Sequence, residues 1–581
     1  MPRFTLQNVL AIGLALIFLS KMVMGKLVAI TTVGQVTTII FAAGAGYALG
    51  WFLSPQAAAF RAAIKVAMLL LLALLVLGNN TMFGWSATYF AAMIAFVMAL
   101  GMWAGAAIRA LATRPTTFGS AEWATLPYLR AHKLVGTTGI RLGQFTTAEE
   151  TEALHYDSDR HLLTIAPTRS GKGTTAIVPN LLSYRGSVMV IDPKGENALI
   201  TAEQRRAMGQ EVYIVDPWNI ASGGEGARFN PLDWLVAGDI DITENAMLLA
   251  DALIVPEGEG DKFWIEEAKA LLQGFILYVA TSQYEEGQRT LARVRDLLLL
   301  DGDDMKLLFQ RMLDSEHHIV MSTGARCAQK EEKLLANVIA SAQAQTHFLD
   351  SARLRESLSA SDFKFEDLKT KPMSIYLVLP ADRLNAFNRW LRLLIQQAIT
   401  VNARNIAVKP DKPVLFLLDE LPALGKLTMV EQAFGLMAGF GMQLWGIAQD
   451  LGQLKKIYGE GGYESLISNS GMIQYFGSRD KMTAEYFSAL CGVTTVWNLS
   501  TAVSRAFSYS SGPNGGSSSN STTSTDTNSA IQRKLAYADE LMRLPKHRQL
   551  IFIENHHPII GTKVTWFEDE QLKALGCNLQ R

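Results

Sequence analysis

The sequence predicts an α/β protein in which an all-helical insertion interrupts a parallel sheet and membrane-spanning helices precede it. Short apolar segments alternate with helical sequence, which is typical of a parallel sheet. Residues 241–361 instead show helical periodicity and no clear strand. The start of the chain holds long apolar stretches with few charges. We therefore expect a membrane region of about four helices in residues 1–112, and an α/β domain made of residues 113–240 and 362–581.

Apolar residues are concentrated at the start of the chain. The protein has 581 residues, of which 49% are hydrophobic, and a mean hydropathy of +0.14. A membrane-spanning helix needs about 20 consecutive apolar residues. The first candidate is interrupted by Lys21, and Lys26 follows it, so two or three spans remain an alternative. A signal peptide in residues 1–25 is disfavoured, because three more apolar stretches follow. The candidate spans are residues 9–24, 28–53, 62–78 and 85–108.

The charges beside these stretches predict their orientation. Arg109 and Arg114 follow the last stretch, whereas the turn before it, residues 79–84, carries no charge. Because Lys and Arg are enriched on the cytoplasmic side of a membrane, we expect the long C-terminal part in the cytoplasm. Lys21 and Lys26 would lie outside in a four-span arrangement, which leaves the first hairpin open.

A glycine-containing loop follows the first clear apolar strand of the α/β domain, residues 162–165, and precedes a second apolar stretch, residues 176–182. It is close to the phosphate-binding loop G-x-x-x-x-G-K-[ST]. Such a loop turns backbone N–H groups toward nucleotide phosphates at the N-terminus of a helix, and Lys172 would reach the β- and γ-phosphates. The predicted nucleotide-binding residues are Ala166, Pro167, Thr168, Arg169, Ser170, Gly171, Lys172, Gly173 and Thr174.

The loop departs from the simple pattern at two positions. Ala166 replaces the first glycine, and Gly173 occupies the place of the hydroxyl residue that usually binds Mg²⁺. Thr174 carries the next hydroxyl along the chain. Either Thr174 or a water molecule would therefore complete the metal site.

Further strands and helices are expected around the insertion. Apolar strands at residues 188–192 and 211–216 each end in Asp-Pro, with helical sequence between them. After the insertion, residues 372–379 form a strand and residues 383–403 a helix. Within the insertion, helices are expected at residues 244–253, 263–281, 290–300, 304–313 and 331–348.

A second apolar strand carries the acidic residues that the loop needs. Residues 414–418 are entirely apolar and lead into Asp419 and Glu420. In open α/β sheets ligands bind at the carboxyl ends of the strands. Asp419 would hold Mg²⁺, directly or through water, and Glu420 would activate the attacking water as a general base. The combination of loop and acidic strand predicts ATP as the ligand.

Gln449 ends the next predicted strand, residues 442–449. An amide at this position can contact the γ-phosphate of ATP. The alternative is an ordinary helix cap, a role that polar side chains commonly take.

The end of the chain holds a low-complexity segment and further strands. Residues 508–529 are almost all Ser, Thr, Asn and Gly, a composition typical of a flexible exposed loop. Strands are expected at residues 471–476, 549–553 and 561–566, the last two as a terminal hairpin that closes the sheet.

The remaining composition excludes several classes of site. The net charge of −1 gives no global signature of nucleic-acid binding, so any DNA surface must be local. Cys327, Cys491 and Cys577 fit neither a disulfide framework nor a metal site, and their spacing agrees with a reducing compartment. The histidine pairs 317–318 and 556–557 lack partners at ligand spacing.

Together, these motifs resemble the type IV secretion coupling proteins, the TraG/TraD group of membrane-anchored ATPases. The resemblance covers roughly residues 115–570 and rests on several motifs in a consistent order. The matching segments are residues 166–174, 177–182, 192–196, 229–231, 263–264, 418–425, 447–454, 483–485 and 541–545.

The resemblance implies a RecA-like ATPase domain with an inserted all-α domain, which uses ATP and Mg²⁺ and assembles as a hexamer. It implies a multi-pass protein of the bacterial inner membrane, with the ATPase domain in the cytoplasm. Its partners would be the type IV secretion channel and a relaxase–DNA complex or effector proteins. The insertion would face the substrate.

In such rings an arginine of the neighbouring subunit stabilises the transition state. Some relatives carry it shortly after the acidic strand, where this chain has residues 437–441 without arginine. Arg389 and Arg479 are weak alternatives, because each fits an ordinary surface or ion-paired arginine better.

Two other functions fit parts of the pattern. A chromosome-segregation translocase of the FtsK type also joins membrane spans to a ring ATPase, but this chain lacks the length for its long linker and terminal DNA-reading domain. A recruitment receptor would use ATP only to fix its assembly and would not need Glu420. A DNA-packaging or pilus-type motor is a minor alternative.

Overall fold

The computed structural model describes residues 40, 42–44, 46, 117–255, 262–512 and 515–579, without the side chains of residues 497–530. The chain divides into two units, one with the residues up to 120 and residues 495–533, the other with residues 121–494 and 534–581. The predicted membrane spans lie almost entirely outside the described residues. Among the helices that are described, none has the length and apolar character that crossing a membrane requires.

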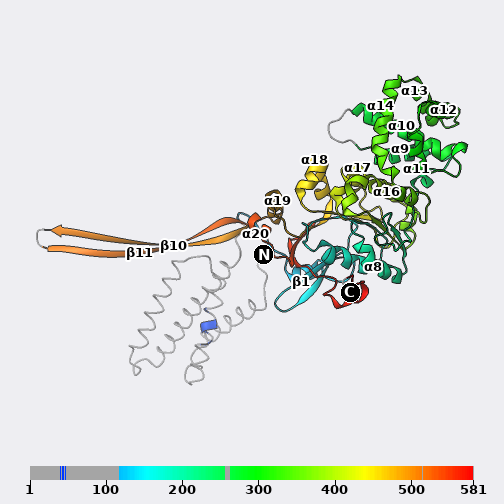
Figure 1. Ribbon diagram of the computed structural model, residues 1–581. Coiled ribbons are helices and arrows are strands. Elements are labelled where there is room, and N and C mark those ends of the chain that lie inside the picture. The colour runs from blue at the N-terminus through cyan, green and yellow to red at the C-terminus, as the bar shows by residue number, and fades with distance from the viewer. Residues whose placement is uncertain are drawn as a thin grey trace. The chain divides into compact units, whose positions relative to one another are not determined.

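Eleven strands form one sheet in the second unit, in the order β2-β1-β13-β12-β9-β3-β8-β7-β4-β6-β5 (Figure 1). Neighbouring strands are parallel from β9 to β5 and antiparallel from β2 to β9. This large parallel part confirms the α/β class. The strands are β1 (Ile140–Thr146), β2 (Thr151–Tyr156), β3 (His161–Ile165), β4 (Val188–Asp192), β5 (Glu211–Val215), β6 (Met373–Val378), β7 (Val414–Leu418), β8 (Met442–Ala448), β9 (Ser470–Tyr475), β12 (Arg548–Ile553) and β13 (Ile559–Thr562).

The central parallel strands are buried along their whole length because helices cover both faces of the sheet, and most of their residues are apolar. Every residue of β3, β4, β6, β7, β8 and β9 is buried, as expected of central parallel strands. Only β5, at the edge, has partly exposed residues. The helices outside the insertion are α6 (Leu126–Ala131), α7 (Val178–Ser183), α8 (Glu196–Ala207), α16 (Leu384–Arg404), α17 (Thr428–Leu436), α18 (Leu451–Ser468), α19 (Lys481–Cys491), α20 (Ala538–Met542) and α21 (Glu570–Leu575).

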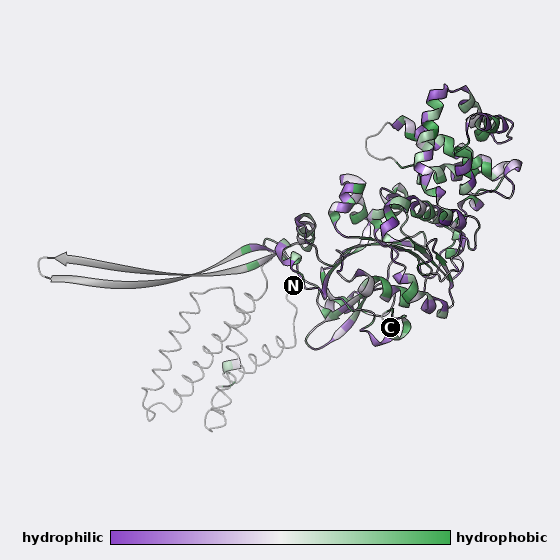
Figure 2. Cartoon of the chain, viewed as in Figure 1, coloured by the Kyte–Doolittle hydropathy of each residue, from purple (hydrophilic) through white to green (hydrophobic). Residues whose placement is uncertain are grey.

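A run of helices connects β5 to β6, which are hydrogen-bonded neighbours in the sheet. Its described residues contain no strand, and its helices carry both hydrophobic and hydrophilic residues (Figure 2). The five helices predicted here are observed, and α13 and α15 occur in addition. The helices are α9 (Ile242–Leu253), α10 (Lys262–Thr281), α11 (Leu291–Leu298), α12 (Gly302–Leu313), α13 (His318–Gln329), α14 (Glu332–Thr346) and α15 (Ala352–Ser357).

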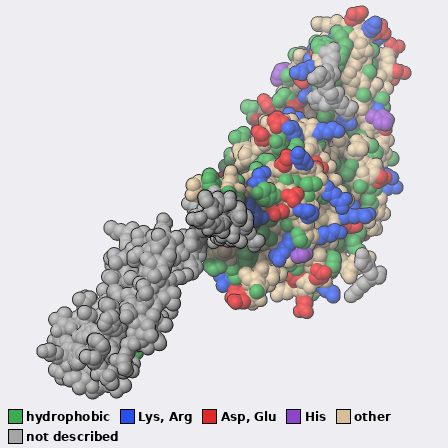
Figure 3. All heavy atoms as spheres, turned by 90° about the vertical axis from the view of Figure 1, so that its left-hand side faces the viewer, with side chains coloured by type: hydrophobic (Ala, Val, Ile, Leu, Met, Phe, Trp, Pro, Cys, Tyr) green, Lys and Arg blue, Asp and Glu red, His purple; other side chains and the backbone are tan. Residues whose placement is uncertain are grey.

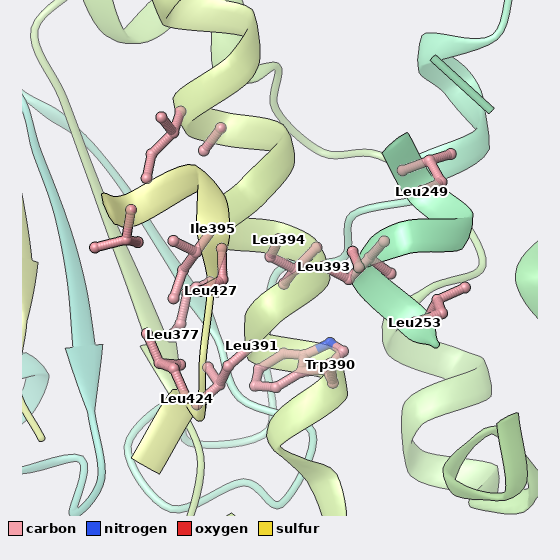
Figure 4. Packing of buried hydrophobic residues seen from close by; sticks show 14 of the residues in the cluster. Leu249, Leu253, Leu377, Trp390, Leu391, Leu393, Leu394, Ile395, Leu424 and Leu427 are labelled. Carbon is pink, nitrogen blue, oxygen red and sulfur yellow. The ribbon is translucent and has the colours of Figure 1, made fainter. Parts of the chain in front are cut away.

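Helix α16 joins the helical run to the sheet. Its residues Trp390, Leu391, Leu393, Leu394 and Ile395 are fully buried. They belong to one hydrophobic cluster with Leu249 and Leu253 of α9 and with Leu377 of β6 (Figure 4). Because this helix is covered on several sides, polar residues such as Arg392, Gln396 and Gln397 are buried along it as well. The core of the second unit therefore continues from the sheet into the helical run.

The C-terminal hairpin does not close the sheet at its edge. Strands β12 and β13 lie between β9 and β1, and the edge strands are β2 and β5. The predicted strand at residues 561–566 is shorter and earlier, ending at Thr562. Lys563 N–H still donates to His547 O at 2.8 Å, in register with the pairing of Arg548 and Thr562, and the chain then leaves the ladder, since Trp566 N–H donates to Thr174 O at 3.0 Å.

The structure assigns strands rather than a loop to the described residues of 508–529, and their flexibility stays a prediction. They lie in β10 (Val493–Gly512) and β11 (Gly515–Lys534), a separate two-stranded sheet. The two strands run side by side and, because only residues 513–514 connect them, are antiparallel (Figure 1). Main-chain hydrogen bonds hold such a ribbon, so it needs no alternating apolar pattern. At its base, Thr495 N–H donates to Gly119 O at 3.1 Å.

The surface of the second unit carries charges of both signs. On the face seen in Figure 3, acidic and basic side chains are interspersed with apolar ones. This mixture agrees with the net charge of −1. It means that any nucleic-acid surface of this unit depends on local groups rather than on overall charge.

Candidate functional site

The carboxyl ends of β3, β8 and β7 lie side by side at one edge of the sheet. Strand β8 lies between the other two, and all three are parallel. Strand β3 leads into the loop at Ala166, β8 into Gln449, and β7 into Asp419 and Glu420. The fold thus brings the predicted residues to one place from three distant parts of the sequence.

The start of the loop explains why it does not need its first glycine. Ala166 is fully buried, and its N–H donates to Ala448 O at 2.8 Å, which extends the pairing of β3 with β8. Positive φ angles occur later, at Arg169 (62°) and Gly171 (92°). Only the second of these positions has a glycine, so Arg169 adopts a conformation that costs a non-glycine residue about 1 kcal/mol.

The helix after the loop begins with a π-helical turn, Gly173–Ile177, and continues as α7. The N–H of Val178 donates to Gly173 O, five residues back. The next residue is Pro179, which has no N–H. Thr174 O therefore has no donor within the helix, and it accepts from the N–H of Trp566 instead. Single π-helical turns of this kind are frequent at functional sites.

The two threonines after the loop point their hydroxyls back into it. Thr174 Oγ1 donates to Gly171 O at 3.2 Å, and Thr175 Oγ1 donates to the same oxygen at 2.9 Å. A Cβ atom placed on Gly173 would meet no atom within 4 Å, so the space where a hydroxyl residue usually stands is open. The structure does not bring Thr174 into contact with Asp419, and the choice between Thr174 and water stays a prediction.

Lys172 bridges both acidic residues. Its Nζ atom lies 2.7 Å from Asp419 Oδ1 and 3.0 Å from Glu420 Oε2. The other oxygen of Glu420 accepts a hydrogen bond of 2.8 Å from Gln449 Nε2, and Gln449 Oε1 accepts one of 3.3 Å from Thr168 Oγ1. Loop, acidic strand and amide thus form one connected polar network.

Burial and the neighbouring charges shift the pKa values of this network in opposite directions. Burial is the largest single effect on the pKa of Lys172 and lowers it, but the two carboxylates together outweigh burial, so this pKa is raised. Burial raises the pKa of Asp419, against the attraction of Lys172. On the neighbouring strand β4, burial raises the pKa of Asp192 to about 7, although Ala198 N–H donates to it. The site therefore concentrates carboxyl groups that need a nearby cation.

Glu420 is held in a strained conformation. Its φ angle is 63°, in the left-handed region that non-glycine residues seldom adopt. Such outliers persist where surrounding contacts hold them, and they cluster at functional sites. Here, the contacts with Lys172 and Gln449 fix both carboxylate oxygens of Glu420.

The two candidate arginines lie elsewhere within this chain. Arg389, on α16, donates to Gln345 Oε1 at 2.8 Å and so links α16 to α14. Arg479 is exposed after β9. Neither has a described hydrogen bond to the loop or to the acidic pair, so a role for either one would be toward a neighbouring subunit.

Two residues of the site are missed by reasoning from the sequence. Lys563, which follows β13, donates from Nζ to Ser170 O at 2.9 Å, and Trp566 N–H donates to Thr174 O. Both contacts span more than 390 residues and belong to no local motif. A lysine directly after a short apolar strand carries no signal that could have identified it.

A family profile and several curated proteins match this chain. The profile described as type IV secretory system conjugative DNA transfer matches residues 123–580. Protein VirD4 of Agrobacterium fabrum is 28% identical over 422 residues, which cover 71% of this chain and 60% of that protein. Conjugal transfer protein TraG of Escherichia coli is 28% identical over 454 residues, covering 72% of this chain and 69% of that protein. The chain thus spans about three fifths of the length of VirD4.

Solved structures show the same fold. The plasmid coupling protein TrwB in complex with ADP and Mg²⁺ aligns with a TM-score of 0.55 at 16% identity, over 77% of this chain and 94% of that chain. TrwB with a non-hydrolysable ATP analogue aligns with a TM-score of 0.54, over 77% and 93%. At this identity the likeness supports the α/β P-loop ATPase fold alone.

Proposed function

The chain belongs to the type IV secretory system conjugative DNA transfer family, and from this premise we propose that it is a coupling ATPase of a type IV secretion system. It would recruit a relaxase–DNA complex or effector proteins to the secretion channel, and ATP hydrolysis would help to drive their transfer. Its relatives VirD4 and TraG, the latter named as a conjugal transfer protein, support this assignment over an FtsK-type translocase.

One observation carries the proposal: Lys172 of the loop contacts Asp419 and Glu420 of the acidic strand at 2.7 and 3.0 Å. A loop lysine and two carboxylates, brought together at the carboxyl edge of a parallel sheet, are the groups that nucleotide hydrolysis uses. A protein that only bound nucleotide would not need the second carboxylate.

Each residue of the network has a chemical task under this proposal. Backbone N–H groups of the loop would bind the phosphates, at the positive end of the helix that follows. Lys172 would shift its ammonium from the carboxylates to the β- and γ-phosphates. Glu420, released from Lys172, would then orient a water molecule and accept its proton. Gln449 would hold Glu420 by donating from Nε2 to Glu420 Oε1 and, by contact with the γ-phosphate, report the presence of that phosphate.

The residues present also fit Mg²⁺. Asp419 Oδ1 is buried and is paired with the ammonium of Lys172 at 2.7 Å, so it would become available as a ligand once Lys172 moves to the phosphates. Carboxylate oxygens are the hard ligands that Mg²⁺ prefers. Asp419 would hold the ion directly or through water, with Thr174 Oγ1 or water in the place that Gly173 leaves open. When bound, the ion would neutralise charge on the phosphates.

The assembly and its location complete the proposal. The apolar stretches in residues 1–112 would anchor the protein in the bacterial inner membrane by up to four helices, with the ATPase domain in the cytoplasm. A hexameric ring would place each site against a neighbouring subunit, whose arginine would approach the phosphates. The helices between β5 and β6 would form the substrate-facing domain.

The ATPase rate of the full-length protein in detergent tests the proposal. Rates are measured with ATP and Mg²⁺, with and without single- or double-stranded DNA, and Lys172→Ala serves as the blank. Removal of Lys172 takes a charge-assisted contact from the phosphates, so hydrolysis should be abolished. Full activity in Lys172→Ala would overturn the site.

The DNA arms of this experiment separate the two kinds of cargo. Stimulation by DNA that disappears in Lys172→Ala would support a DNA-translocating coupling protein. Turnover indifferent to DNA would indicate a protein-effector coupling protein. The third alternative is tested by substrate transfer rather than by ATPase rate. If transfer tolerates Glu420→Gln, the protein would be a recruitment receptor without a motor role.

A further inference from the structure

The segment after β13 lies against the phosphate-binding loop on both sides of Lys172. On one side, Lys563 Nζ donates to Ser170 O at 2.9 Å. On the other, Trp566 N–H donates to Thr174 O at 3.0 Å. The indole of Trp566 packs with Val178 and Leu182 of α7 in a small hydrophobic cluster. Two residues three positions apart, Lys563 and Trp566, thus contact the loop before and after its lysine.

Lys563 is an unusual residue for such a place. It is only 8% exposed, and no acidic side chain in the described parts of the chain pairs with it. Its ammonium lies 4.4 Å from the centroid of the Phe476 ring, and burial lowers the pKa of Lys563 to about 8. Burying a charge without a carboxylate is costly, so a lysine here requires a compensating contact. The contact that the structure offers is the carbonyl of Ser170.

The position of that carbonyl sets the direction of the next N–H group. In a planar trans peptide, the C=O of one residue and the N–H of the following residue point in opposite directions. Lys563 holds Ser170 O toward itself, so the N–H of Gly171 points away from Lys563. This N–H has no recorded acceptor among the described residues. It is therefore free to bind a ligand on the opposite side of the loop.

The contact of Trp566 secures the other end of the same loop. Thr174 O lacks a helical donor because Val178 N–H bonds to Gly173 O and Pro179 has no N–H. Without Trp566, this buried turn would carry an unsatisfied carbonyl. The loop is thus held at residues 170 and 174, and Lys172 lies midway between these two anchors.

We propose that Lys563 is a positioning residue of the nucleotide site, which holds the Ser170 carbonyl outward so that the Gly171 N–H faces the phosphates of ATP. This inference rests on the proposed function, because it assumes that the loop binds ATP. It assigns to a residue of the C-terminal segment a role in nucleotide affinity that does not require contact with the nucleotide.

The test compares two buried lysines that make the same kind of contact. Lys563→Met removes the ammonium with little change in size. Lys369→Met is the matched control, because Lys369 is 5% exposed and donates to a main-chain carbonyl, Asn405 O, at 2.6 Å, without contact to the loop. Lys563→Arg keeps a cationic donor at the position. All are made in a Glu420→Gln background, so that ATP is bound without rapid turnover.

The readout is the Kd for ATP with Mg²⁺, measured by displacement of a fluorescent ATP analogue from the full-length protein in detergent. Lys563→Met should raise this Kd by about tenfold or more, the value of one charge-assisted hydrogen bond. Lys563→Arg should keep it within about threefold, and Lys369→Met should leave it unchanged while lowering the thermal midpoint. A folded Lys563→Met protein with the Kd of its parent would overturn the inference.

Two further measurements keep the outcomes separate. If the parent protein and Lys172→Ala bind ATP equally, the proposed function has failed, and not merely this inference. If Lys563→Met does not fold, hydrogen–deuterium exchange of the wild type decides. ATP should then slow exchange in residues 559–569 as well as in residues 166–178, and protection of the loop alone would overturn the role of Lys563.

Discussion

Replacing Glu420 with glutamine separates chemistry from binding at the proposed site. The side chain keeps its size but loses its charge and its ability to accept a proton. We expect Glu420→Gln to bind ATP and to turn it over about 10²- to 10⁴-fold more slowly, the range typical for loss of a general base. This corresponds to about 3–5 kcal/mol of activation free energy.

The hydrogen-bond network predicts that the fold tolerates this change. In the wild type, Glu420 accepts from Lys172 through Oε2 and from Gln449 through Oε1. A glutamine can still accept from Lys172 with its carbonyl oxygen. Its amide can donate to Gln449 if that side chain turns over, because Gln449 would then donate to the Thr168 hydroxyl, which also accepts. Every polar atom keeps a partner, so we expect the thermal midpoint to change by no more than a few degrees, equivalent to about 1 kcal/mol.

The assay measures three quantities on the full-length protein. Steady-state phosphate release gives kcat, titration of a fluorescent ATP analogue gives Kd, and a thermal melt gives the midpoint. Glu286→Gln is the matched control, since Glu286 is exposed in the helical run and distant in sequence from the site. We expect its three values to equal those of the wild type.

The reasoning about Glu420 would be refuted by a kcat within tenfold of the wild type, which would require another base. If the thermal midpoint falls by ten degrees or more while turnover per folded molecule is unchanged, Glu420 stabilises the fold and does not take part in hydrolysis. Affinity for ATP should stay equal or increase, because a negative charge near the phosphates is removed.

Three other predictions concern stability. His161 is fully buried, donates from Nε2 to Ala433 O and accepts from Leu444 N–H at Nδ1, and burial lowers its pKa to about 4. Since the unfolded chain binds this proton below about pH 6.5, the free energy of unfolding should fall by up to about 3 kcal/mol as the pH drops from 6.5 to 4. Urea titrations at pH 7 and 4.5 should show a smaller loss of unfolding free energy in His161→Gln than in the wild type. Equal losses in the two proteins would contradict the assignment of this pH dependence to His161. Trp390→Ala should lower the free energy of unfolding by about 3–5 kcal/mol in the same titrations, because the indole is fully buried; a loss below 1 kcal/mol would mean that the cluster around α16 is not formed. Deletion of residues 511–526, which removes the tip of the β10–β11 ribbon and the first part of β11, should leave both the ATPase rate and the thermal midpoint of the second unit unchanged, and loss of soluble expression of residues 113–581 would contradict this.

Local sequence patterns predict the parallel sheet and the centre of the site. The strand before Ala166 and the strand before Asp419 are short apolar runs, and each leads directly into its functional residues. Parallel pairing then brings their carboxyl ends together without further information. For this reason the contact of Lys172 with Asp419 and Glu420 follows from two motifs alone.

Features that depend on distant contacts are not predictable in this way. Helix α13 contains Thr323 and Gly324, which have low intrinsic helix propensity. It forms because close packing favours it: a Cβ on Gly324 would lie 2.9 Å from Met312 Cβ, and one on Gly274 of α10 would lie 2.5 Å from Thr323. No local sequence pattern predicts the ribbon at residues 493–534 or the contact of Lys563 with the loop.

The place of the C-terminal hairpin in the sheet sets an order for folding during synthesis. Strands β1 and β2 join the sheet only through β13, which the ribosome makes roughly 400 residues after β2. At a synthesis rate of about 5–20 residues per second, some 20 to 80 s pass between the synthesis of β2 and that of β13. Throughout this time β1 presents an unpaired edge, and β9 presents another from its own synthesis until β12 follows about 70 residues later; such edges invite association with other chains. A chain that stops before β12 therefore exposes two open edges of the sheet, and it also lacks the residues that complete the nucleotide loop.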